Sequence, residues 1–159
     1  MRGPAKFNFD TKRNDMTISE LFEQIAAGAC KGFSWCYDIR RMQNVTADNM
    51  TFPVVWMEEY YSDRSVWDEF TRMRELTVEI HFQDLVPMQG VAIDRERVRE
   101  RLRVTGVEPF MAHLNLYALR RGMPQVEEWQ CDPEPPMFDA NATGVLLRFT
   151  FRYPSCMEL

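Results

Sequence analysis

Few residues in this 159-residue sequence are of the types that perform catalysis or bind metals. It has two histidines, and neither is accompanied by ligands or a nucleophile at a recognisable spacing. His81 lies beside Glu79 in an alternating segment, and His113 lies in an apolar stretch. We interpret the adjacent Glu58 and Glu59 as a solvated strand end. The sequence therefore predicts no catalytic residues, no metal ligands and no cofactor, and it favours a protein that is not an enzyme.

The cysteines and the chain termini bear on the cellular compartment. No CxxC pair occurs among the four cysteines, at positions 30, 36, 131 and 156. The first residues lack the apolar run of a signal peptide, and no stretch approaches the ~20 apolar residues of a membrane span. We therefore expect a protein that stays in the cytoplasm with free thiols.

A run of alternate arginines is the most unusual local feature, comprising Arg95, Arg97, Arg99, Arg101 and Arg103. Acidic residues lie among them, so one interpretation is a solvated helix face with ion pairs to Glu96 and Glu100, worth a few tenths of a kcal/mol each. The other is a contact surface for an acidic partner, a neighbouring copy of the chain, or DNA in a channel. The net charge of −5 argues against a general nucleic-acid binder, because phosphate neutralisation needs a basic excess.

Alternation of apolar and polar residues predicts most of the strands. It is unbroken from Leu76 to Gln83, which is typical of a strand with one buried and one wet face. The same pattern predicts strands over residues 33–40 and 145–153. Residues 52–61 and 126–131 are further strand candidates, and the first is apolar on both faces over residues 54–57.

Two helices are predicted. Thr17 and Glu20 form a capping box that begins a helix ending near Gly32. A longer helical pattern begins at Asp94 and ends at Arg121. Gly106 and Pro109 lie inside it, so we expect a kink or a break near residues 105–108.

These elements define an α+β fold with a single, mostly antiparallel sheet of four to five strands. The N-terminal helix and the long kinked helix are expected on one face of that sheet. Residues 62–74 are expected to form a connection with some helical character. We expect residues 1–15 to form a mobile N-terminal arm, residues 16–154 a single domain and residues 155–159 a C-terminal tail.

The predicted elements leave apolar surface to spare. The second half of the long helix is apolar around most of its girth, which is typical of a helix covered on more than one side. The sheet is expected to cover one side, and either the N-terminal helix or another subunit the other. The residues expected at this subunit interface are Val55, Met57, Phe110, Met111, Leu114 and Tyr117.

The order of these elements, with a few particular positions, resembles a known family. An aromatic-Pro-Val-Val segment, Phe52–Val55, precedes the alternating strand Leu76–Phe82. A helix with the centre Phe110–Leu114 and a final strand, Val145–Tyr153, follow. Over roughly residues 17–153 the chain is similar to the tail-completion, or tail-terminator, proteins of tailed bacteriophages and to the related neck proteins.

The resemblance implies a virion component without catalytic activity or cofactor. Members of that family form rings, commonly hexamers, which cap the tail tube and join it to the head. It implies that the chain forms such a ring, binds other phage tail or neck proteins, contacts no membrane, and is assembled in the host bacterial cytoplasm. Arginines that face the lumen of such a ring would line a passage for DNA, and those at positions 95–103 are the candidates. The alternative is a small cytoplasmic module, monomeric or dimeric, that binds a ligand or a protein on the polar sheet face or in a pocket.

Overall fold

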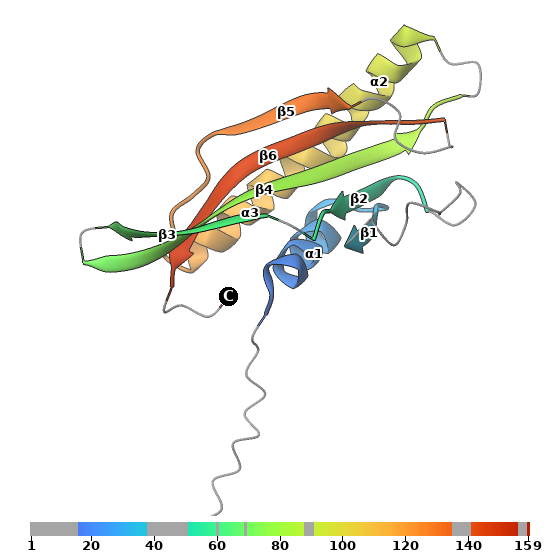
Figure 1. Ribbon diagram of the computed structural model, residues 1–159. Helices are drawn as coiled ribbons and strands as arrows, with labels where there is room; N and C mark the ends of the chain where they lie inside the picture. The colour runs from blue at the N-terminus through green and yellow to red at the C-terminus, as the bar shows by residue number, and fades with distance from the viewer. Residues whose placement is uncertain are drawn as a thin grey trace, which may run out of the picture.

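The computed structural model describes residues 16–37, 51–59, 61–68, 70–87, 91–134, 141–155 and 159. Its elements in chain order are α1 (Ile18–Ala29), β1 (Ser34–Tyr37), β2 (Val54–Met57), β3 (Ser62–Asp68), β4 (Thr71–Leu85), α2 (Ala92–Leu102), η3 (Arg103–Val107), α3 (Glu108–Arg120), β5 (Trp129–Glu134) and β6 (Ala142–Pro154). Figure 1 shows their arrangement. The predicted N-terminal arm lies outside the described residues.

Six strands form one mixed sheet in the order β1-β2-β4-β6-β5, with β3 also paired to β4. The pairs are antiparallel except β1–β2, which is parallel. Because β6 occupies one edge of β4 along almost its whole length, β2 and β3 share the other edge. The predicted α+β class and the mostly antiparallel sheet are confirmed. The sheet has one strand more than the four to five expected.

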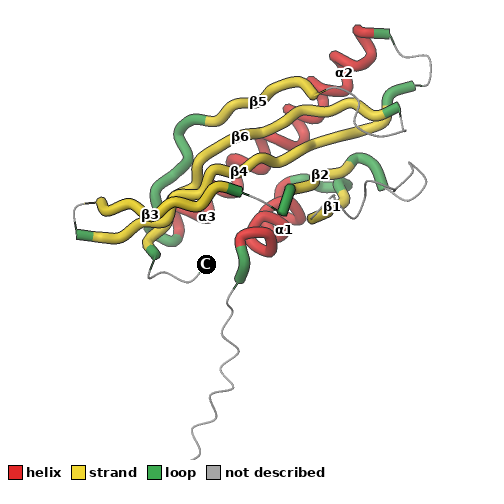
Figure 2. The backbone as a smooth tube through the Cα atoms, viewed as in Figure 1, coloured by secondary structure: helices red, strands yellow, loops and turns green. Residues whose placement is uncertain are grey.

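The helices cover one face of this sheet (Figures 1 and 2). Alternate β4 side chains point toward them and are fully buried, namely Leu76, Val78, Ile80 and Phe82. On α1, the ring of Phe22 lies edge-on to Phe149 of β6 and Phe110 of α3, with centroids 5.7 and 6.0 Å away. Such aromatic pairs add about 0.5–1.5 kcal/mol each beyond the area they bury. The core therefore joins α1, α3 and the two longest strands.

The long helix is disturbed at the predicted place, but as a π-helical turn rather than a break. Residues 103–107 form this turn, η3, and Pro109 follows in the first turn of α3. A Cβ atom on Gly106 would lie only 2.7 Å from Phe82, so a glycine lets the helix approach the sheet. The thiol of Cys30 donates a hydrogen bond to the Gly106 carbonyl at 3.3 Å, which ties the end of α1 to the same turn.

The prediction for residues 62–74 was wrong. They form β3 and the first part of β4, a hairpin that extends past the helices at one end of the sheet (Figure 1). The strands are joined by cross-strand ion pairs, with 2.8 Å between Arg64 and Glu75 and 2.5 Å between Arg74 and Asp63. The sequence pattern missed this strand because polar residues lie on both of its faces. Alternation of apolar and polar residues indicates that one face is buried, and it does not detect pairing with another strand.

Candidate functional site: the polar sheet face and the projecting hairpin

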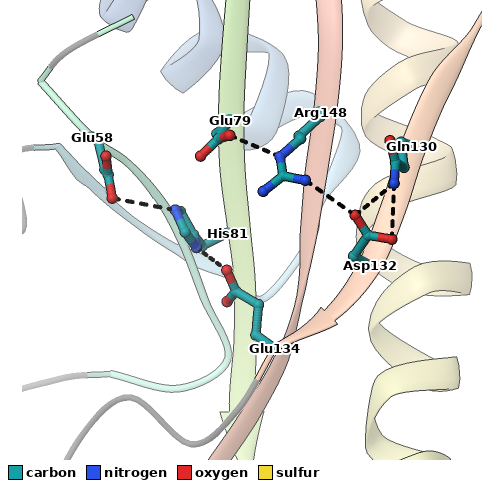
Figure 3. Close-up of polar contacts among 7 residues, drawn as sticks. All are labelled: Glu58, Glu79, His81, Gln130, Asp132, Glu134 and Arg148. Atoms are coloured by element: carbon teal, nitrogen blue, oxygen red, sulfur yellow. Dashed lines mark hydrogen bonds and ion pairs between the residues drawn. The ribbon is translucent and has the colours of Figure 1, made fainter.

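The sheet face opposite the helices carries hydrogen-bonded polar side chains from several strands (Figure 3). The ladder places Glu79 of β4 opposite Arg148 of β6, and Arg148 opposite Gln130 of β5. Facing residues of neighbouring strands project to the same side of a sheet. Three strands therefore contribute to one continuous surface, which no helix of the described residues covers.

Arg148 is the centre of one network on this face. Its Nε donates to Glu79 at 2.8 Å and its Nη1 donates to Asp132 at 3.3 Å. The hydrogen bond that Arg148 donates to Glu79 raises the pKa of Arg148 above its ordinary value. Each of the three side chains is about 40% exposed, and exposed ion pairs typically contribute only about 0.2–1 kcal/mol. The network orients these side chains more than it stabilises the fold.

A second, buried group surrounds His81 (Figure 3). The imidazole stacks on the indole of Trp56, its partner across β2 and β4, with centroids 3.5 Å apart and an interplanar angle of 1°. Its Nδ1 is hydrogen-bonded to Glu134, and Gln83 donates to the other oxygen of that carboxylate at 3.1 Å. Trp56, His81, Gln83 and Glu134 are each less than 10% exposed.

Gly144 makes this group possible. It lies on β6 between Gln83 of β4 and Glu134 of β5. A Cβ atom at this position would come within 2.5 Å of the Gln83 side chain and of the Phe82 carbonyl. The missing side chain lets a β5 carboxylate reach across β6 to β4. Sequence analysis missed this because its strand candidate ended at residue 131, and only the strand register brings Glu134, Gly144 and Gln83 side by side.

The surroundings of His81 decide whether its imidazole can act in catalysis or bind a metal ion. Its Nδ1 donates to a carboxylate, an arrangement that orients a catalytic or metal-bound histidine. The other nitrogen, Nε2, has no described hydrogen-bond partner, and the nearest carboxylate oxygen, on Glu58, is 3.9 Å away. Among the described residues, no nucleophilic side chain is therefore hydrogen-bonded to Nε2 of His81. The same residues contain no group of three or more potential metal ligands.

The projecting hairpin carries the two most exposed large apolar side chains of the described residues. Trp67 is 74% exposed and Phe70 is 94% exposed. Arg72 lies directly opposite Trp67 in the ladder. Its guanidinium donates to Ser65 at 3.3 Å and has no carboxylate partner among the described side chains. We call Trp67, Phe70 and Arg72 the hairpin tip.

A groove of about 800 Å³ lies on the polar face, between β6 and the segment that leads into β5. Its lining includes residues 124–130 along one side and Glu75, Thr77, Arg148, Thr150 and Arg152 of β4 and β6. Hydrogen bonds from Arg152 and Arg64 lower the pKa of Glu75 despite the opposing effect of burial. We call this feature the β6 groove.

The residues predicted at a subunit interface lie neither on the polar sheet face nor in the hairpin tip. Val55, Met57, Phe110, Met111 and Leu114 are at most 1% exposed and belong to the chain's own core. As folded they offer no surface to a neighbour, because they pack in the core between the helices and the sheet. The exposed apolar side chains of α3 are Leu116 and Leu119. Tyr117 is partly buried, and the guanidinium of Arg121 lies 5.5 Å from the centre of its ring.

The predicted arginine surface is partly ion-paired. Arg101 contacts Asp84 at 2.7 Å, a weaker contact of 3.9 Å joins Arg103 to Glu108, and Arg97 lies 4.0 Å from Asp94. These contacts favour the ion-paired helix face. Contact with DNA or an acidic partner stays a prediction for Arg95, Arg97, Arg99, Arg101 and Arg103. The other histidine, His113, is exposed and is hydrogen-bonded through Nδ1 to the Pro109 carbonyl.

No protein-family model and no curated protein matches this chain. Within the described residues, no helix is both long enough and apolar enough to cross a membrane. The resemblance to phage tail proteins therefore rests on the order of elements and the few positions described above.

Proposed function

We propose that the chain is a non-enzymatic structural subunit that assembles into a ring at the tail end or head–tail junction of a tailed phage. It would act as a tail-completion or tail-terminator protein, with a hexamer favoured. Its partners would be other copies of itself and other tail or neck proteins, and DNA would pass through the ring.

The observation that carries this proposal is the projecting hairpin. Apolar side chains as exposed as Trp67 and Phe70 are characteristic of contact surfaces, and aromatic residues are enriched at the centres of interfaces. A hairpin that reaches past the body of a subunit can contact a different surface on the next copy. Contacts between unlike surfaces produce rings when the rotation closes.

The test is the solution mass of the purified protein, measured by light scattering across concentration, with negative-stain images of the same samples. We expect ring-shaped particles with a mass at a closed multiple of 18.8 kDa. A monomer at every concentration would contradict self-assembly.

The alternative is a small ligand- or protein-binding module, and two observations favour it. The β6 groove offers space, and five buried side-chain polar atoms lack a described partner. Three of the five belong to the group around His81: Trp56 Nε1, His81 Nε2 and Gln83 Oε1. Buried polar groups ordinarily find partners. A monomer whose thermal stability rises on adding a compound from a metabolite panel would support this alternative.

A further inference from the structure

We propose that two copies of the chain pair about a two-fold axis through the outer face of α3, defined by Ala112, Leu116 and Leu119. The occupant of this face is the same face of a second copy, with the two helices antiparallel. The inference goes beyond the proposed function, because a two-fold contact joins copies in pairs and cannot by itself close a ring.

The outer face of α3 is an apolar surface that the chain's own fold leaves uncovered. Leu114, on the inner side of the helix, is fully buried. Successive residues of an α-helix are about 100° apart, so Leu116 and Leu119 lie roughly opposite Leu114. They are 42% and 60% exposed, and Ala112, one turn before Leu116, is exposed as well. The helix therefore has apolar residues on both sides, and the sheet covers only the inner one (Figure 2).

The sequence of this face is complementary to itself when it is reversed. Exposed residues follow one another at intervals of four, in the order Glu108, Ala112, Leu116 and Arg120, which places them in one row along the helix. In an antiparallel pair centred on this row, Leu116 of each copy lies level with Ala112 of the other. Glu108 of each copy likewise lies level with Arg120 of the other. A large side chain therefore meets a small one, and a carboxylate meets a guanidinium, twice in every pair.

The charges at the two ends of the row are available for this contact. Glu108 has one ionic contact, at 3.9 Å from Arg103, which is beyond hydrogen-bond length, and its side chain is 55% exposed. Arg120 has no ion pair among the described residues. The next residue, Arg121, lies over the ring of Tyr117. In a parallel pair like charges would meet at both ends, so the charges favour the antiparallel arrangement.

Self-complementarity is the reason for choosing a second copy as the occupant. A two-fold interface uses the same patch on both subunits, so the patch must match its own reverse in size and in charge. The row on α3 meets both requirements. An unrelated partner would require neither.

Leu116→Lys tests the pairing, because it would place a charge at the centre of the contact. Leu116 is already partly exposed, so the variant should keep the wild-type circular dichroism spectrum. We expect light scattering to show half the wild-type mass, whether the wild type is a pair of chains or a pair of rings. The matched control is Leu85→Lys on β4, at a 46% exposed leucine, which should keep the wild-type mass. An unchanged mass for Leu116→Lys would overturn the pairing.

Charge exchange tests the antiparallel direction. Glu108→Arg and Arg120→Glu would each bring like charges together at both ends of the contact, and each should weaken pairing at least about tenfold. The double variant Glu108→Arg/Arg120→Glu restores opposite charges and should pair like the wild type. A double variant that pairs no better than the single variants would contradict the proposed register.

Negative-stain images of the same samples separate this inference from the ring proposal. Pairs of chains without rings, split into single chains by Leu116→Lys, would refute the ring and support the pairing. A single ring whose mass Leu116→Lys leaves unchanged would refute the pairing and leave the ring proposal standing. A monomeric wild type would refute both.

Discussion

At the residue scale, Gly144 is the position where a single methyl group has the clearest consequence. Its Cβ would meet the Phe82 carbonyl, a backbone atom that cannot move aside. We expect Gly144→Ala to destabilise the fold by about 1–3 kcal/mol in urea unfolding. At Gly28, near the end of α1, the nearest atom would be 3.7 Å away, so Gly28→Ala should stabilise by roughly 0.5–1 kcal/mol. Equal effects at the two sites would contradict this packing.

The buried carboxylate beside His81 leads to a second prediction. Glu134→Ala would leave the Gln83 amide and one imidazole nitrogen buried without their partner. Each unsatisfied group costs about 1–3 kcal/mol, so we expect a lower midpoint in chemical denaturation. Asp132→Ala, on the same strand but in the exposed Arg148 network, should cost less than about 1 kcal/mol. A near-neutral Glu134→Ala would show that the cluster contributes nothing to folding.

Cys30 gives a third prediction. Its thiol is 2% exposed, and burial raises its pKa from 9.0 to about 12. Only the thiolate reacts with alkylating reagents, so Cys30 should resist iodoacetamide at pH 8 until the protein unfolds. The unfolded thiol ionises first as pH rises, so its contribution to stability falls above about pH 9. Peptide mass spectrometry can follow the labelling, with the partly exposed Cys36 as an internal comparison. Rapid labelling of Cys30 in the folded protein would contradict its burial.

At the scale of elements, the strands with one buried face were predictable and the others were not. Residues 76–83 and 145–153 alternate because helices cover only one side of the sheet there. β3 escaped detection because its residues are polar or exposed on both faces and its pairing with β4 defines it. β5 lies at 129–134 rather than 126–131, so it extends past the predicted end and includes Pro133.

The π-helical turn leads to the prediction at this scale. Such a turn holds one residue more than an α-helical turn, so deleting one residue from it should preserve the faces of α2 and α3. We expect deletion of Val104, which is 51% exposed, to give a folded protein. Deleting the exposed Ala112 should rotate one side of α3 by about 100° and remove Leu114 from the core. Circular dichroism and thermal melting distinguish the two deletion variants. If both deletions are tolerated equally well, the extra residue in η3 does not set the faces that α2 and α3 present to the core.

At the scale of the whole molecule, the candidate surfaces arise from residues far apart in sequence. His81 and Glu134 are 53 positions apart and meet only because β4, β6 and β5 pair in one register. Likewise, the β6 groove combines residues 124–130 with polar side chains of β4 and β6 that are distant in sequence. The predicted interface on α3 came from counting apolar residues, and the structure places those residues in the chain's own core.

The last prediction couples assembly to stability. If folded copies associate, mass action stabilises the native state, and unfolding must first release the contacts between them. Well above the dissociation constant, each tenfold rise in protein concentration should raise the Tm by roughly 3–6 °C. A variant that combines Trp67→Ala/Phe70→Ala with Leu116→Lys should melt at one temperature regardless of concentration, whereas Leu85→Lys should keep the wild-type dependence. Differential scanning calorimetry over a hundredfold concentration range measures this, and a concentration-independent wild-type Tm would show that its folded copies do not associate.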